Sequence, residues 1–439
     1  MNYIKSMIYI GCVLLSYQVV AQRVLTKSEA LEIALENNYG VKIANNNVEI
    51  AKNNSSIYNS GYLPSLSANA GANYNLSDQT VEFQDGSVTD VEGAESKGYN
   101  ASVNMNYVLF DGMGRKYNYK QLKETYNLSE LQARETIENM HLQLFSVYFQ
   151  IARLSENVTN LDKALNISKE RLKRAEYQYE YGQTTKLELL NAEVDVNNDS
   201  IALLNANQLY DNSKRDLNIL LGVKEAIDFE VETEVEFLPL FTFEDVLEKA
   251  KQNNVSLLQA DKNIAISEFN LKVNKSGYIP TIGLNGSYGW NKNINPSTAF
   301  NAGTDVTGLN AGITFTWDIF DGGSTKTRIA NSQIQLENQK ILKQQQEETL
   351  DYTMKNSFES YRNALFVLQA QEQNILTNKN NFDRSVERYK LGQISSIEFR
   401  QAQVNLLNAQ TAYNDAKFTA KLLELELLQL TGEITNVAI

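Results

Sequence analysis

Apolar residues recur at helical spacing along four stretches that contain neither glycine nor proline. These stretches are residues 115–181, 183–221, 324–391 and 393–431. Glycine and proline are the residues that most disfavour a helix interior, so each stretch is predicted to be one helix. At 1.5 Å per residue the two longest would each span about 100 Å. Their apolar stripes are narrow and interrupted by Asn, Gln and Ser, which favours a hollow cylinder of helices with one wet face.

A second pattern, with apolar and polar residues alternating strictly, occupies shorter segments between these helices. Alternation with period two predicts strands that have one apolar and one polar face. Strand lengths near ten, with aromatic residues close to the ends, fit strands that span a lipid bilayer, although a soluble sandwich alternates in the same way. The predicted strands are residues 66–74, 101–109, 281–290 and 309–319.

Four strands are too few to close a barrel, because about eight is the practical minimum and open edges are not tolerated in lipid. The barrel must therefore be shared between chains. Three chains would supply twelve strands and two chains would supply eight. The predicted class is a mixed α+β membrane protein.

The chain is an internal duplication of about 210 residues. SGYLPSL at 60–66 returns as SGYIPTI at 276–282, and Phe110-Asp111-Gly112 returns as Phe320-Asp321-Gly322. We expect short helices at 41–60 and 255–275 to extend the columns formed by the predicted helices at 183–221 and 393–431. The predicted organisation is a first repeat at 22–222, a linker in an equatorial region at 223–240 and a second repeat at 241–439, with strand hairpins at about 62–110 and 278–320 and helical hairpins at about 115–221 and 324–431.

The composition and the N-terminal segment indicate a secreted protein and argue against several functional classes. Residues 1–21 hold an apolar run that ends in Val19-Val20-Ala21, the pattern of a secretory signal peptide, while a lipoprotein signal at Cys12 is the alternative. Cys12 is the only cysteine, and the formal charge is −13, so neither a disulfide in the mature chain nor nucleic-acid binding is expected. No later stretch approaches eighteen consecutive apolar residues.

One motif closes both helical hairpins. Residues 179–192 read YEYGQTTKLELLNA and residues 389–402 read YKLGQISSIEFRQA. Gly182 and Gly392 can adopt the left-handed conformation that ends a helix. Thr185-x-x-Glu188 and Ser395-x-x-Glu398 are predicted to be capping boxes for the returning helices. Both copies are therefore expected to be hairpin tips, distant from the strands.

Enzyme chemistry finds no support in the sequence. There is no nucleophile–histidine pair and no phosphate-binding loop, and His141 is the only histidine, inside a long predicted helix. No catalytic site, cofactor or metal site is expected. A helical stalk protein without a pore is the structural alternative, which the four amphipathic strands argue against.

Taken together, these features resemble the TolC family of outer-membrane efflux proteins. The resemblance rests on the duplication, on Phe-Asp-Gly after each strand hairpin, on Gly-Tyr-x-Pro before it, and on Tyr-x-x-Gly at both tips. It implies a homotrimer with a twelve-stranded barrel in the outer-membrane lipid of a Gram-negative bacterium and a long periplasmic α-helical barrel. It also implies partners, namely a periplasmic adaptor protein and an inner-membrane RND or ABC transporter. The hairpin loops at 75–99 and 291–308 would face outside.

The resemblance also assigns residues. Tip contact with the adaptor would fall on Tyr179, Gly182, Gln183, Tyr389, Gly392 and Gln393, while an ordinary solvated turn is the alternative for Gln183 and Gln393. Glu188 and Glu398 would either narrow the tip or only cap helices. This chain departs from the family at Gln401, where a second acidic residue is usual, and at Ile394, where a basic latch residue occurs. The implied function is the exit duct of a tripartite export system for small molecules such as drugs. A type I secretion duct for proteins or peptides is the alternative.

Overall fold

The structure is a computed structural model that describes residues 23–224, 228–239 and 242–436. The predicted signal peptide at 1–21 lies outside these residues. The chain divides into two compact units. The helical unit contains the described residues of 1–46, 132–258 and 345–439, and the sheet unit contains residues 47–131 and 259–344.

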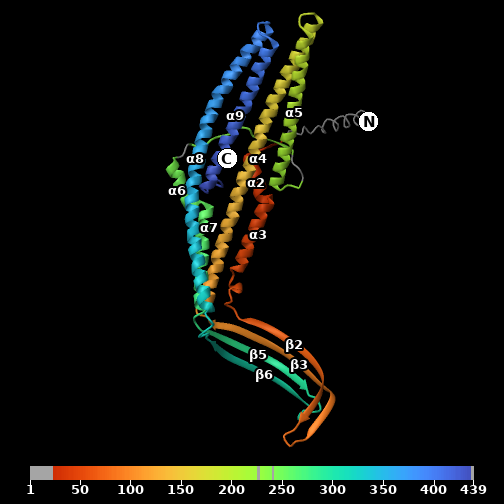
Figure 1. Cartoon of the computed structure of the whole chain (residues 1–439), viewed down its shortest axis with the longest axis vertical. Helices are drawn as coiled ribbons and strands as arrows, with labels where there is room; N and C mark the ends of the chain where they lie inside the picture. The colour runs from red at the N-terminus through yellow and green to blue at the C-terminus, as the bar shows by residue number, and fades with distance from the viewer. Residues whose placement is uncertain (1–22, 225–227, 240–241, 437–439) are drawn as a thin grey trace, which may run out of the picture. The chain divides into compact units, whose positions relative to one another are not determined.

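Four long helices follow the stretches that lack glycine and proline (Figure 1). They are α4 (Gly114–Glu180), α5 (Lys186–Leu221), α8 (Ser324–Lys390) and α9 (Ser396–Leu430). Their ends agree with the predicted ends to within three residues. In the part of the chain that the structure describes, no helix combines the length and the apolar character needed to cross a bilayer.

A pair of short helices precedes each strand hairpin. The first pair is α2 (Lys27–Asn37) and α3 (Tyr39–Asn54), and the second is α6 (Phe243–Asn253) and α7 (Val255–Ser276). Thr26 and Thr242 cap α2 and α6, because each side chain accepts a hydrogen bond from a backbone N–H in the first turn. The helix expected at 41–60 ends earlier, at Asn54, and a short 3-10 turn, η1 (Ile57–Asn59), follows it.

An asparagine joins three helix ends in each repeat. The Asn38 carboxamide donates to Leu220 O at 2.8 Å, in the last turn of α5, while its Oδ1 accepts from the backbone N–H groups that begin α3. Asn254 repeats this arrangement, donating to Leu430 O at 3.0 Å in the last turn of α9 and capping α7. One side chain thus satisfies helix-end groups that have no partner within their own helices. Equivalent bonds by Asn38 and Asn254 explain why an asparagine stands at this position in both repeats.

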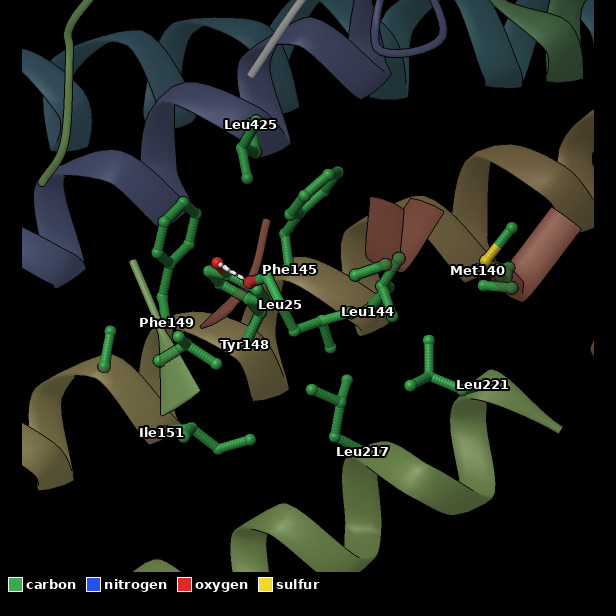
Figure 2. Close-up of a cluster of buried hydrophobic side chains, with 14 of the residues drawn as sticks. Leu25, Met140, Leu144, Phe145, Tyr148, Phe149, Ile151, Leu217, Leu221 and Leu425 are labelled. Atoms are coloured by element: carbon green, nitrogen blue, oxygen red, sulfur yellow. Dashed lines mark hydrogen bonds between the residues drawn. The ribbon is translucent and has the colours of Figure 1, made fainter. Parts of the chain in front are cut away.

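The main core of the helical unit lies around Tyr148, at the middle of α4 (Figure 2). Two three-residue strands, β1 (Arg23–Leu25) and β4 (Phe229–Val231), pair in parallel and cover it. The Tyr148 hydroxyl donates to Leu25 O at 2.7 Å and accepts from Glu232 N at 3.0 Å. The linker predicted at 223–240 therefore contains a strand that belongs to this core.

The rest of the linker is held by side chains of α9. Lys417 Nζ donates to Thr233 O at 3.3 Å, and Lys421 Nζ donates to Glu236 O at 2.8 Å. Glu424 accepts from Leu238 N at 2.7 Å and pairs with Lys421 at 2.5 Å. Three side chains on one face of α9 therefore hold the backbone of an extended segment that has no regular pairing there.

The sheet unit contains one antiparallel sheet with the order β2-β3-β5-β6 (Figure 1). Its strands are β2 (Ser65–Glu82), β3 (Val88–Phe110), β5 (Thr281–Ile294) and β6 (Gly303–Thr316). The expected loops at 75–99 and 291–308 are wrong, because strand pairing continues through most of both segments and leaves only 83–87 and 295–302 as connections. The prediction also carried the last strand to residue 319, whereas β6 ends at Thr316.

We predict that Asn254→Ala destabilises the protein by about 1–3 kcal/mol, because it leaves the α9 carbonyl and the α7 amides without partners. Asn253→Ala is the matched control, since this neighbouring side chain is exposed. Urea denaturation of the intact protein, followed by circular dichroism, measures the difference. Equal midpoints for the two variants would contradict the role assigned to Asn254.

Candidate functional site at the hairpin tips and on the sheet

Both long hairpins turn through the same glycine motif. Gly182 has φ +70° and Gly392 has φ +72°, which only glycine adopts without strain. Gln183 N donates to Gln178 O at 2.7 Å and Gly182 N donates to Tyr179 O at 3.0 Å. The second tip repeats these bonds at 2.8 and 3.0 Å, from Gln393 and Gly392. This double closure ends a helix by satisfying its last carbonyls, as the sequence predicted for the two glycines.

The two tips differ where the returning helix begins. Ser395 and Glu398 form the capping box, with Glu398 N donating to Ser395 Oγ at 3.2 Å and Ser395 N donating to Glu398 Oε2 at 2.8 Å. The capping box predicted at Thr185 is wrong, because the Thr185 side chain makes no cap hydrogen bond. Glu188 instead accepts from the Thr184 hydroxyl at 2.7 Å. The neighbouring hydroxyl at 184 competes for the carboxylate that the box would need.

The predicted tip residues fall into two groups by exposure. Tyr179, Gln183 and Gln393 are exposed at the tips. Tyr389 is only partly exposed. Its ring stacks on Phe399 with centroids 4.7 Å apart, and the Arg174 guanidinium lies 4.9 Å from the centroid of the Tyr389 ring. Tyr389 thus packs the second tip against α4.

Four exposed apolar side chains at the tips were not anticipated from the sequence. Tyr181 and Leu391 precede the two glycines and are 77% and 71% exposed. Leu187 and Ile397 lie in the first turns of α5 and α9 and are 66% and 72% exposed. These pairs are 210 residues apart, so aligning the two copies could have found them. Each tip therefore presents two apolar side chains beside its polar glutamine.

A buried polar network joins the two hairpins below the tips. Arg400 of α9 forms two hydrogen bonds with the Asp199 carboxylate of α5, both at 2.7 Å. The Ser168 hydroxyl of α4 donates to the same carboxylate at 2.6 Å. Burial alone would raise the pKa of Asp199, but the bonds from Arg400 and Ser168 outweigh it and hold that pKa below its usual value. Asp199 is therefore a buried, ionised link among three helices.

Additional contacts, one to two turns closer to the tips, join α4 to α5 and to α8. Arg171 of α4 pairs with Asp195 of α5, and Arg174 of α4 donates to Lys390 O at 3.2 Å, at the end of α8. A cation at this carbonyl also complements the negative end of the α8 dipole. The first hairpin thus holds the second through charged side chains as well as through the Tyr389 ring.

The sheet has one apolar and one polar face, as the alternation predicted. Backbone register aligns Ala68, Val103, Tyr288 and Leu309 in one row across the four strands. The next row, on the opposite face, is Ser67, Asn104, Ser287 and Asn310.

Large apolar side chains on the first face are open to solvent in the single chain. Leu309 is 73% exposed and Ile313 is 71% exposed. Within the described residues, β2 and β6 each pair with one neighbour only, so both outer edges of the sheet are open. In water, a single chain would therefore leave the backbone groups of both sheet edges unpaired and the large apolar side chains exposed.

The residues that could carry other chemistry are few. Over the described ranges, no group of three or more His, Cys, Asp and Glu side chains is arranged to hold a metal ion. His141 is buried in the core with its ring edge-on to Phe145, and burial lowers its pKa. His141 therefore packs in the core as an uncharged ring.

These features define a class of protein that combines long helical hairpins with a four-stranded antiparallel sheet whose large apolar side chains are exposed. The family model described as "Outer membrane efflux protein" matches residues 30–223 and 246–433. The chain belongs to the outer membrane efflux protein family, whose fold is that of TolC-like channels.

Known relatives cover most of the chain at low identity. Outer membrane protein TolC of Vibrio cholerae is 21% identical over 384 residues, covering 86% of this chain and 84% of that protein. Outer membrane efflux protein BepC of Brucella suis is 22% identical over 420 residues, covering 93% and 86%. The crystal structure of the Campylobacter jejuni CmeC outer membrane channel aligns with a TM-score of 0.77 at 18% identity, covering 95% and 90%.

We predict that Ser395→Ala destabilises the second hairpin by about 1 kcal/mol, whereas Thr185→Ala at the first tip has little effect. Hydrogen bonds from the Ser395 backbone and hydroxyl lower the pKa of Glu398 below 4.5. The contribution of the ionised carboxylate is therefore present above pH 4.5 and is lost as pH falls through the lowered pKa. Hydrogen exchange of the tip amides at pH 7 and pH 3 measures both effects. A similar change in exchange for the two variants would contradict the assignment.

Proposed function

We propose that three copies of this chain form an outer-membrane exit duct that carries small molecules, such as drugs and other toxic compounds, out of the periplasm. Twelve strands would close one barrel in the outer membrane, and the helical hairpins would form the periplasmic tunnel. A periplasmic adaptor and an inner-membrane RND or ABC transporter would complete the export system. The duct itself performs no pumping, so these partners select the cargo.

The observation that carries the proposal is the sheet with one exposed apolar face and two open edges. Backbone groups at a strand edge cannot remain unpaired in lipid, and four strands are too few to close on themselves. A β2 edge of one copy can pair with a β6 edge of the next, which removes every edge when the ring closes. The apolar row with Leu309 would then contact lipid, while the polar row with Asn310 would line the lumen.

The tips support the docking part of the proposal. Each carries an exposed glutamine beside its turning glycine, together with two exposed apolar side chains. Exposed apolar groups beside polar ones at a rigid turn are suited to contact another protein. Glu398 is engaged in its capping box, so capping is its first role at the tip.

We predict that Leu309→Lys lowers the stability of the barrel by about 2–4 kcal/mol, because it places a charge on the lipid face near the middle of β6. Asn310→Lys is the matched control on the lumen face. Urea unfolding in lipid vesicles compares the variants, and light scattering of the unmodified detergent complex counts its copies. Equal effects of the two lysines would contradict the assignment of faces, and a stable monomer would refute the shared barrel.

A photo-crosslinking probe at Gln393 is predicted to capture the adaptor protein in living cells, because this side chain is exposed beside the tip glycine. The matched control is a probe at Ser87, in the turn between β2 and β3, which would lie outside the cell. Mass spectrometry identifies what is caught. Capture of a drug-export adaptor supports the proposed cargo class, and capture of a protein-secretion system would replace it. If Gln393 captures only neighbouring copies while export proceeds, tip docking is refuted.

A further inference from the structure

A polar groove of about 560 Å³ lies in the helical unit, apart from the tips and the sheet. One wall is a face of α4 that includes Glu156, Asn160 and Lys163, at helical spacing. Another part of the lining is a face of α9 that includes Gln410 and Tyr413, and α8 contributes Ile375. Residues of and after β4 complete the groove, among them Glu230 and Thr233.

The floor of the groove is held in place by internal contacts. Lys417 Nζ bonds Glu156 Oε1 at 2.7 Å and Thr233 O at 3.3 Å, so it joins α9 to both of the other walls. Asn414 is buried and donates to Asn157 Oδ1 at 3.2 Å. A groove whose walls are joined in this way is preorganised, which lowers the entropic cost of binding a ligand.

The charges around the groove balance. Glu156 and Lys417 neutralise each other in their ion pair. The lining contains two more charged side chains, Lys163 and Glu230, and their charges are opposite in sign. The two positive and two negative side chains of the lining cancel, which suits a ligand without net charge. Glu372 of α8, which is outside the lining but together with burial raises the pKa of Tyr413, further disfavours an anion there.

The remaining polar groups are amides that have capacity to bind. Asn160 of α4 and Gln410 of α9 both line the groove, and over the described ranges neither side chain makes a hydrogen bond to another residue. Each carboxamide offers two N–H donors and one carbonyl acceptor. Paired donors and acceptors of this kind match hydroxyl groups, which both donate and accept. Tyr413, three residues after Gln410 on α9, has a half-buried ring whose centroid is 5.9 Å from Lys417 Nζ. This ring offers an aromatic surface against which a flat C–H surface can pack.

We propose that this groove binds an uncharged sugar chain, with Asn160 and Gln410 bonding its hydroxyl groups and Tyr413 packing against one sugar ring. Because the helical part of the protein lies in the periplasm, the source of such a chain is the glycan of the peptidoglycan wall. The groove would anchor the protein to the wall at the level of β4. This inference does not depend on the proposed export function, because an anchor requires only the location of the protein.

The test measures binding of the purified full-length detergent complex to isolated peptidoglycan sacculi by co-sedimentation. Binding of the soluble N-acetylglucosamine tetramer is measured by calorimetry. Tyr413→Ala is expected to weaken binding to both roughly three- to tenfold, because it removes the packing surface. Tyr413→Phe keeps the ring and is expected to retain binding. Gln410→Leu is expected to weaken binding by a similar factor.

Matched controls on the same unit are Tyr352→Ala and Gln369→Leu, which alter exposed side chains of α8 outside the groove. Neither should change binding, and unaltered size-exclusion profiles would establish that the variants assemble. Lipopolysaccharide serves as the second sugar source, and binding to it in preference to sacculi would reject the wall as the ligand. The proposal is overturned if the unmodified protein binds neither sacculi nor the tetramer, or if Tyr413→Ala binds as tightly as Tyr352→Ala.

Discussion

The helical unit depends on one buried hydroxyl group. Tyr148 OH bonds a carbonyl next to α2 and an amide of the linker, so it attaches both three-residue strands to the middle of α4. Strands this short are not stable alone, and burial of Leu25 and Phe229 beneath them supplies the apolar contact that they need. Burial of the hydroxyl raises the pKa of Tyr148, so it stays protonated and donates. The beginning of the first repeat and the middle of the linker are thereby fixed at the same level of one long helix.

Buried charges then set the register of the long helices. Narrow apolar stripes along helices of 67 residues resemble one another at successive turns, so apolar packing alone allows the helices to slide past each other. Arg400 pairs with Asp199 near the start of α9, and Lys421 and Glu424 bind the linker nearer the end of the same helix. A shift of one turn would separate Arg400 from Asp199, leaving a buried carboxylate without its cation at a cost of several kcal/mol, and would break the bonds of Lys421 and Glu424 to the linker backbone. Two separated polar contacts on one helix therefore define a single alignment.

Local rules account for what could be predicted from the sequence. The absence of glycine and proline located α4, α5, α8 and α9, and the left-handed glycines located both tips, because these are properties of a few adjacent residues. Strand ends were missed at Glu82 and Val88, where polar side chains hide a pairing that backbone hydrogen bonds sustain. Asp199 and Arg400 are 201 positions apart, and no spacing rule relates them. The partial burial of Tyr389 was missed for the same reason, since its cation partner, Arg174, belongs to the other repeat.

The two repeats keep the same backbone closures but differ in the side chains that support them. The second tip has a complete capping box, and its tyrosine is packed between Phe399 and Arg174. In the second repeat α6 and α9 end close together, and Arg134 donates to Asn253 O at 3.1 Å and to Gly432 O at 3.0 Å there. Arg134 thus binds two helix ends at once. At the first tip Thr185 makes no cap bond, and Tyr179 is exposed. Duplication supplied two equivalent turns, and the added contacts make the second the more firmly held. The first tip consequently has the lower barrier to local rearrangement, because fewer side-chain contacts must break before its turn can move.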